Sequence, residues 1–251
     1  MDEVILKEHH DDNLVFFKDE KIPFTHCTPD RKMTVSELFR FTSDSAGEDF
    51  SLRNMSWQFL YDKGLAIILS RASYHINKMP VADQIITLKT WESAAQGPLC
   101  TRNYEIYAYG TDELLVKGQT LWTILDLKNK RLMPAKAYPY RPLPTVVTDF
   151  DGIKCGKISM PENMEVLGTK TILYSDLDAN GHSNNSKYIN FVLDLLPNEF
   201  QTKNFTDVRL NYSKETKLGD QLEIKVAYEE NKIIAQGIVD GTSSFEAELY
   251  Y

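Results

Sequence analysis

A short internal repeat constrains this sequence more than any other feature, because a duplicated unit sets the architecture of the whole chain. The stretch beginning at His75 resembles the stretch beginning at Tyr212. In both, a strand-like run leads into a turn that ends in Asp-Gln, and a second strand-like run follows. Asp220 lies 137 residues after Asp83, and Tyr212 lies 137 residues after His75. The chain is therefore predicted to contain two halves built on one plan.

The first half is predicted to contain helices followed by long strands. Thr34 begins a helix over residues 34–42, and Glu37 three residues later completes a capping-box pattern. A second helical segment over residues 51–63 ends at Gly64. Runs rich in Ile, Thr, Tyr and Trp follow, separated by turn signals. They predict strands over residues 66–77, 84–93, 100–109 and 114–126.

The second half repeats this order. A short strand over residues 169–174 precedes a polar stretch and a helix over residues 185–196, which Pro197 stops. The helix carries apolar residues on most sides, which is typical of a helix wrapped by other elements. Alternating runs predict strands over residues 208–212, 221–229, 232–239 and 243–250.

A curved antiparallel sheet around a central helix is the hot-dog architecture. We therefore predict an α+β fold of the tandem (double) hot-dog type, with two antiparallel sheets that each wrap a central helix. Residues 1–132 would form the first repeat and residues 168–251 the second. Residues 133–167 would connect them, because four prolines between Met133 and Pro144 indicate an extended segment.

The polar stretch 176–185 concentrates two carboxylates, three amides and one histidine in ten residues. Three interpretations are open: a metal loop, a capped turn or an acid–base site. Asp176, Asp178 and Asn180 fit the first ligand positions of an EF-hand loop. The twelfth position requires a bidentate Glu, however, and it is Lys187. The metal interpretation therefore fails, and no metal site is predicted.

A helix cap explains Asn184 or Asn185 and leaves three other side chains unexplained. Asp178, Asn180 and His182 alternate, so they would share one side if the stretch were extended. The N–H groups at the start of the following helix could hold a developing oxyanion. Acid, amide, imidazole and N–H donors together suit hydrolysis of an acyl group.

The bulk properties exclude several classes of function. The chain has 251 residues, 42% hydrophobic and 25% charged, with a net charge of −8. These values are typical of a globular protein and argue against a nucleic-acid partner. No secretion signal and no membrane-spanning run are recognised, and the three cysteines match no disulfide or zinc pattern. We expect a cytoplasmic protein without a cofactor.

The motif from Asp176 to Ile189 resembles the active-site motif of the acyl-ACP thioesterases, which release fatty acids in plant plastids and bacteria. The stretch from Leu210 to Thr216 resembles that family's downstream catalytic strand, so Glu215 is expected on a strand. Arg31–Arg40 and Lys89–Trp91 extend the resemblance over nearly the whole chain. It implies hydrolysis of fatty acyl-acyl carrier protein (ACP) thioesters to free fatty acid and holo-ACP.

The resemblance places the family's catalytic residues on Asp178, Asn180, His182 and Glu215. Many plant members carry a cysteine at the next position, where this chain has Thr216, so a cysteine nucleophile is not expected. A water would be activated by Glu215 or Asp178 with help from His182, or Asp178 would form a covalent anhydride. The first half lacks the motif around Cys27 and is expected to be catalytically silent.

By the same resemblance, the acyl chain would lie in the first repeat. Trp57, Phe59, Leu60 and Thr216 are the predicted substrate contacts, although core packing explains the first three equally well. The partner would be an acidic acyl carrier protein, which requires a local basic patch. The alternatives are an acyl-CoA thioesterase of the same fold, a non-catalytic acyl-binding protein or a hydratase. Sequence does not decide the oligomeric state, and a homodimer is one of the states considered. Candidates for the patch are Arg71, Lys89, Arg102, Lys128, Lys130, Arg131, Lys136 and Arg141.

Overall fold

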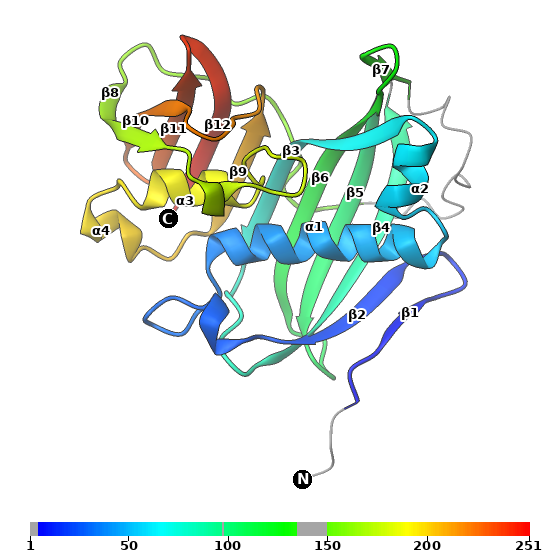
Figure 1. Ribbon diagram of the computed structural model, residues 1–251. Helices are drawn as coiled ribbons and strands as arrows, with labels where there is room; N and C mark the ends of the chain where they lie inside the picture. Colours follow the sequence, from blue (N-terminus) through cyan, green and yellow to red (C-terminus); the bar gives the residue numbers. More distant parts are fainter. Residues whose placement is uncertain (1–4, 97, 135–149) are drawn as a thin grey trace.

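The computed structural model describes residues 5–96, 98–134 and 150–251. Within these residues, twelve antiparallel strands form one continuous sheet. A long helix crosses the face of the sheet in the first repeat, and a shorter helix lies against the second repeat (Figure 1). The structure is the double hot-dog fold that the sequence predicts, with its two sheets joined edge to edge.

The first repeat contains a long central helix and most of the long strands. Thr34 caps the helix as predicted, because its Oγ1 accepts the N–H of Glu37 at 3.1 Å. The elements are β1 (Glu8–His10), β2 (Phe16–Lys21), the 3-10 turn η1 (Phe24–His26), α1 (Val35–Leu52), α2 (Trp57–Asp62), β3 (Leu65–Ile76), β4 (Ile85–Gln96), β5 (Leu99–Ala108), β6 (Leu114–Asp126) and β7 (Arg131–Met133).

The second repeat follows the same order with a shorter helix. Its elements are β8 (Glu165–Thr171), the 3-10 turn η3 (Tyr174–Asp176), α3 (Lys187–Leu193), α4 (Asn198–Gln201), β9 (Asp207–Tyr212), β10 (Gln221–Glu229), β11 (Lys232–Val239) and β12 (Thr242–Tyr250). Strand β8 begins at residue 165, so the expected repeat boundary at residue 168 falls inside this strand.

The strand order is symmetric about the junction between the repeats. It runs β1-β2-β4-β5-β6-β3-β9-β12-β11-β10-β8, so β3 and β9 pair at the centre. On either side, β6 corresponds to β12, β5 to β11, β4 to β10 and β2 to β8. At the junction Ser73 pairs with Arg209, while Ala72 pairs with Leu210 and Tyr74 with Val208. A pseudo-twofold axis therefore passes through the Ser73–Arg209 pair.

The repeat is real, but the sequence alignment was wrong by one residue at the turn. The N–H of Asp83 donates to the carbonyl of Ile22, and the N–H of Gly219 donates to that of Ile172, both at 2.9 Å. Asp83 and Gly219 also share a positive φ, 65° and 88°. Gly219, not Asp220, is thus the counterpart of Asp83. The two Asp-Gln pairs, at Asp83 and Asp220, are therefore not structurally equivalent. The repeats share the backbone geometry of the turn, and the similar side chains lie one position apart.

One hydrophobic core joins the two repeats. It includes Leu38 and Phe39 from α1 and Ile189 and Val192 from α3, all nearly inaccessible to solvent. The strands predicted at residues 114–126, 221–229 and 232–239 are confirmed at both ends. Helix α1 continues ten residues beyond the predicted end at residue 42, and α2 is shorter than predicted. Most of the proline-rich segment lies outside the described residues.

Candidate active site

The predicted catalytic loop is anchored by Asp176, which is only 8% exposed. Its Oδ2 accepts the N–H of Leu173 at 2.9 Å and lies 2.9 Å from Lys170 Nζ. Its carbonyl accepts the N–H of Asn184 at 2.8 Å, just before α3. Asp176 therefore ties both ends of the loop together and has a structural role.

Asp178 closes a tight turn inside this loop. Its Oδ1 accepts the N–H of Asn180 at 2.8 Å and that of His182 at 3.3 Å. Its own N–H donates to the carbonyl of His182 at 2.8 Å, and Gly181 adopts a positive φ of 78°. The stretch is therefore not extended, because the Asp178 carboxylate holds the backbone in a turn, so the condition for one shared side is not met.

His182 and Glu215 form the closest acid–base pair of the site. His182 Nε2 lies 3.1 Å from Glu215 Oε1, and Lys217 Nζ lies 3.7 Å from the same oxygen. The side chains of His182 and Glu215 are 31% and 56% exposed. Glu215 lies in the loop that follows β9, not within a strand. The structure thus brings together the histidine and the carboxylate that lie 33 positions apart in the sequence.

Thr216 is completely buried beneath this pair. Its Oγ1 donates to Ser183 Oγ at 2.7 Å and lies 3.1 Å from the Tyr188 hydroxyl. Its carbonyl accepts the N–H of Ser183 at 2.9 Å. These contacts fasten the Glu215 segment to the loop that carries His182. The structure therefore indicates a supporting role for Thr216, in place of the expected substrate contact.

A pocket of about 150 Å³ adjoins Asp178 at the border between the repeats. Its walls come from α1 and β3 of the first repeat and from the loop, the start of α3 and β9 of the second. The α1 residues were not predicted, although a pseudo-twofold arrangement brings the helix of one repeat beside the loop of the other. The lining residues are Phe39, Arg40, Ser43, Asp44, Leu69, Asp178, Asn184, Asn185, Ser186 and Tyr212.

Most of the side chains that line this pocket are polar or charged. Burial raises the pKa of the Asp44 carboxyl, although Arg40 Nη1 donates to its Oδ2 at 2.5 Å. The buried Tyr212 hydroxyl donates to the carbonyl of Asn185 at 3.0 Å, and burial raises its pKa well above the usual value. The pocket therefore suits a ligand that brings both polar and apolar groups.

The start of α3 offers fewer hydrogen-bond donors than expected. Asn184 Oδ1 accepts the N–H of Ser186 at 3.0 Å, and the Asn184 carbonyl accepts the N–H of Lys187 at 2.8 Å. The N-cap of α3 is Ser186, and its side chain makes no capping hydrogen bond, so the cap predicted at Asn184 or Asn185 is not observed. The N–H groups of Ser186 and Lys187 are therefore already occupied, and the side-chain amide of Asn180 donates to Asp178 Oδ2 at 3.4 Å.

The first repeat contains the same loop with different side chains. Six backbone hydrogen bonds donated by residues 176–184 recur at residues 26–34, with lengths of 2.7 to 3.2 Å. In this equivalence Thr28, Asp30 and Lys32 occupy the places of Asp178, Asn180 and His182. Lys32 Nζ contacts Asp30 Oδ2 at 2.8 Å and Asn204 Oδ1 at 2.6 Å.

The predicted substrate contacts on α2 lie at a distance from these pocket walls in the fold. Trp57 is 61% exposed and stacks on Tyr61. Phe59 and Leu60 pack in a small apolar cluster with Met55 and Leu65. None of these residues lines the pocket described above. Arg102, considered for a basic docking patch, is 2% exposed and cannot contribute to a surface.

Two further properties concern the described part of the chain alone. It contains no cluster of three or more His, Cys, Asp or Glu side chains arranged to hold a metal ion. No helix in it has the length and apolar character needed to cross a membrane.

Comparison with known proteins identifies the family. Residues 13–137 match the acyl-ACP thioesterase N-terminal domain, and residues 163–245 match the acyl-ACP thioesterase C-terminal domain. Together these matches cover most of the chain. The chain belongs to the acyl-ACP thioesterase family.

Several acyl-ACP thioesterases and hydrolases are similar at low identity. The chloroplastic acyl-[acyl-carrier-protein] hydrolase FATB3 of Cuphea viscosissima is 24% identical over 209 residues, covering 79% of this chain and 50% of the relative. The chloroplastic palmitoyl-acyl carrier protein thioesterase of Cuphea hookeriana is 22% identical over 218 residues, covering 81% and 52%. This chain thus spans about half the length of the curated relatives that it matches.

Solved acyl-ACP thioesterase structures share the fold over nearly the whole chain. An acyl-ACP thioesterase from Bacteroides thetaiotaomicron aligns with a TM-score of 0.81 at 21% identity, covering 95% of this chain and 98% of that one. The 12:0-ACP thioesterase from Umbellularia californica aligns with a TM-score of 0.76 at 17% identity, covering 94% and 96%. At these identities the likeness establishes the double hot-dog fold.

Proposed function

We propose that this protein hydrolyses fatty acyl-ACP thioesters to free fatty acid and holo-ACP. The observation that carries this proposal is the His182–Glu215 pair, 3.1 Å apart. His182 lies on the loop whose Asp178 borders a pocket, and Glu215 lies on the loop after β9. Membership of the acyl-ACP thioesterase family supports the choice of reaction. Asp178, Asn180, His182 and Glu215 are the proposed catalytic residues.

In the proposed reaction, Glu215 acts as the general base. It takes a proton from a water, directly or through His182, and the water oxygen attacks the thioester carbonyl carbon. The Asn180 amide stabilises the resulting oxyanion. The carbon–sulfur bond then breaks, and the carrier thiolate takes up the proton. Lys217, near the carboxylate, and Asp178, which orients the His182 backbone, complete the arrangement.

A covalent anhydride on Asp178 is the competing route. Its carboxylate already accepts two backbone N–H groups, which makes it a weaker nucleophile and favours direct attack by water. A single turnover in ¹⁸O-labelled water distinguishes the two routes. Label found only in the fatty acid supports direct attack, and label in the Asp178 side chain contradicts it.

The proposed partner is an acidic acyl carrier protein. Because this chain also carries a net charge of −8, docking requires a local basic surface. Lys128, Lys130 and Arg131, on the hairpin between β6 and β7, are exposed and are the proposed contacts. We also propose that the protein is cytoplasmic and forms a homodimer. Fractionation and light scattering test these two proposals.

A paired substrate series tests the function. The purified protein is assayed on acyl-ACP and acyl-CoA with identical acyl chains, and thiol release is measured. We expect a higher kcat/KM on acyl-ACP, and a loss of at least a hundredfold in Glu215→Gln. Glu223→Gln, at a glutamate on β10 of the same repeat whose side chain is 44% exposed, is the matched control. A preference for CoA would reassign the carrier, and no hydrolysis of either thioester would contradict the proposal.

A further inference from the structure

The apolar wall of the pocket leads from Leu69 into the first repeat. Leu69 on β3 pairs with Trp122 on β6, and Trp122 pairs with Cys100 on β5. Residues paired directly across antiparallel strands project on the same face of the sheet. Trp122 is therefore the next large side chain inward from the pocket that adjoins Asp178.

Hydrogen bonds place Trp122 on the face covered by α1. Its Nε1 donates to Thr120 Oγ1 at 2.7 Å, and Thr120 pairs across the sheet with Arg102. Arg102 Nη2 contacts Asp49 Oδ2 of α1 at 2.6 Å. The indole therefore lies between the helix and the sheet, where the bond to Thr120 restricts its orientation.

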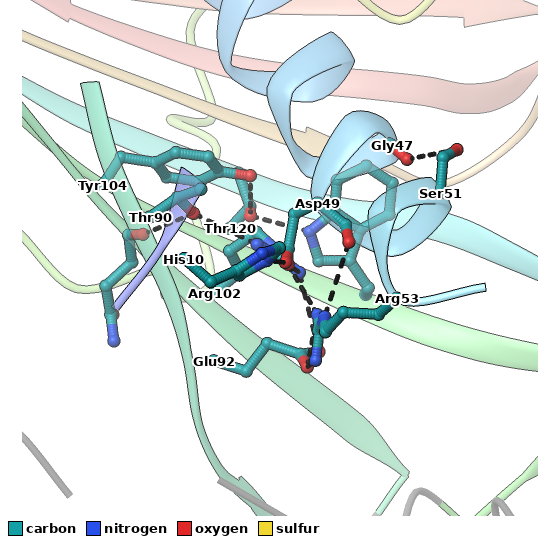
Figure 2. A network of polar contacts seen from close by, with 12 residues as sticks. His10, Gly47, Asp49, Ser51, Arg53, Thr90, Glu92, Arg102, Tyr104 and Thr120 are labelled. Atoms are coloured by element: carbon teal, nitrogen blue, oxygen red, sulfur yellow. Dashed lines mark hydrogen bonds and ion pairs between the residues drawn. The ribbon is translucent and has the colours of Figure 1, made fainter. Parts of the chain in front are cut away.

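A buried ionic network closes the space beside Trp122. Asp49 also contacts His10 Nε2 at 2.7 Å and Arg53 Nη2 at 2.5 Å (Figure 2). Asp49 and Arg102 are 1% and 2% exposed, and Glu92 lies 3.9 Å from Arg102. An alkyl chain cannot displace these charges without leaving one of them buried and uncompensated. A hydrocarbon chain that enters from the pocket therefore cannot extend into the region occupied by Asp49 and Arg102.

Apolar side chains pack on the opposite side of Trp122. The indole packs against the cluster formed by Met55, Leu60, Leu65 and Ile124. The pocket itself measures about 150 Å³, similar to the engineered cavity of about 150 Å³ that holds one benzene molecule. A longer chain consequently requires the space that the indole fills.

We propose that Trp122 is a specificity-determining residue that limits the length of the acyl chain. This inference rests on the proposed function, because it assigns the acyl end of the same substrate. The indole blocks the path from Leu69 to the apolar cluster, and the Asp49–Arg102 network closes the alternative path. Each methylene newly buried contributes a factor of about four in binding, so two additional methylenes give more than tenfold.

The test compares tryptophan substitutions on opposite faces of the sheet. Trp122→Ala and Trp122→Leu open the path by different amounts. Trp91→Leu is the matched control. Trp91 pairs with Asn103 on β5, which is adjacent to Arg102. Adjacent strand residues face opposite sides of the sheet, so Trp91 faces away from α1. For each protein, kcat/KM is measured on acyl-ACPs of increasing chain length. Binding of the corresponding free fatty acids is measured by calorimetry.

We expect the Trp122 variants to shift the optimum to longer chains. The ratio of kcat/KM for long to short chains should rise at least tenfold in Trp122→Ala, and less in Trp122→Leu. Trp91→Leu should leave the ratio within twofold. An unchanged ratio in folded Trp122→Leu, or an equal shift in Trp91→Leu, overturns the inference. If the wild type hydrolyses nothing, the proposed function fails, while the fatty-acid binding series still tests Trp122.

Discussion

The loops at residues 26–34 and 176–184 have the same backbone conformation but different side chains. They share their turn, their hydrogen bonds and their attachment to the segment before β4 or β10. In the second, the imidazole of His182 lies opposite the Glu215 carboxylate. In the first, Lys32 contacts Asp30 and Asn204. The comparison teaches that the fold forms the same loop backbone in both repeats. The two loops therefore differ in their side chains, not in their backbone.

The interiors of the repeats differ as well. Helix α1 has 18 residues and α3 has 7, so only α1 extends far enough to place an aspartate against the sheet. That aspartate, Asp49, organises the buried ionic network of the first repeat. The repeat without the catalytic motif thus contains the more polar interior, which fits its proposed role in selecting the substrate.

The largest expected effect separates the two loops directly. His182→Ala should lower kcat on acyl-ACP by about 10² to 10⁴-fold, because proton transfer by a positioned histidine contributes a factor of this size. Lys32→Ala, at the equivalent position of the first repeat, should leave kcat within twofold. Steady-state kinetics measures both. Equal losses in the two variants would show that the loops do not differ in function.

The buried network provides the next largest effect, on stability. Asp49→Asn should lower the free energy of unfolding by on the order of 3 kcal/mol, because Arg102 keeps a buried charge without its closest partner. Urea denaturation measures this loss. Asp12→Asn, at an exposed aspartate of the same repeat, is the control and should change little.

The same aspartate gives a pH dependence of stability. Burial raises the pKa of Asp49, but Arg102 and Arg53 outweigh that effect and hold its pKa below the usual range. Its contribution is therefore fully present above the unfolded pKa of about 3.9 and is lost as the pH falls through the lower folded value. Denaturation curves from pH 3 to 6 should show a smaller loss of stability for Asp49→Asn than for the wild type.

Thr216→Val should have a smaller effect on both activity and stability. It keeps the shape of the side chain but removes the partner of the Ser183 hydroxyl and one of the two contacts of the Tyr188 hydroxyl, which costs about 1 to 2 kcal/mol. We expect kcat to fall about tenfold, because the Glu215 segment loses an attachment. Thr216→Ser restores the hydroxyl and should recover most of the activity. A serine variant as slow as the valine variant would contradict the positioning role.

The smallest effect concerns the backbone of the turn. Gly181 and Arg31 occupy equivalent places with φ of 78° and 65°. No atom lies within 4 Å of a Cβ built at Gly181, so Gly181→Ala should cost about 1 kcal/mol from backbone strain alone. Arg31→Gly should change stability by less, since relief of strain opposes the entropy of an added glycine. Thermal unfolding measures both, and a larger loss in Arg31→Gly would break the equivalence.

Local patterns predicted much of the fold and several site residues. Alternation located β6, β10 and β11 at both ends, and Thr34 marked the start of α1. The meeting of His182 with Glu215 followed from the family resemblance, since these residues are distant in sequence. Alternation did not predict the turn from Asp178 to His182, because a side-chain carboxylate binds the backbone N–H groups there.

Residues that depend on packing between the repeats could not be predicted. Ser43 and Leu69 carry no chemical signal of their own and line the pocket only because α1 and β3 lie beside the second repeat's loop. Trp57 was predicted to contact substrate or to pack in the core, yet its side chain on α2 is 61% exposed. Thr216 was expected at the substrate, because sequence does not distinguish a buried hydroxyl from an accessible one.

The pairing of β3 with β9 through Ser73 and Arg209 has an evolutionary consequence. Two separate copies of one repeat that paired through this edge would carry identical loops, and any substitution would appear in both. When the two copies are joined in one chain, a substitution can occur in one loop and not in the other. One copy can then lose its chemistry and refine the choice of substrate while the other keeps the reaction, without either change disturbing the shared sheet.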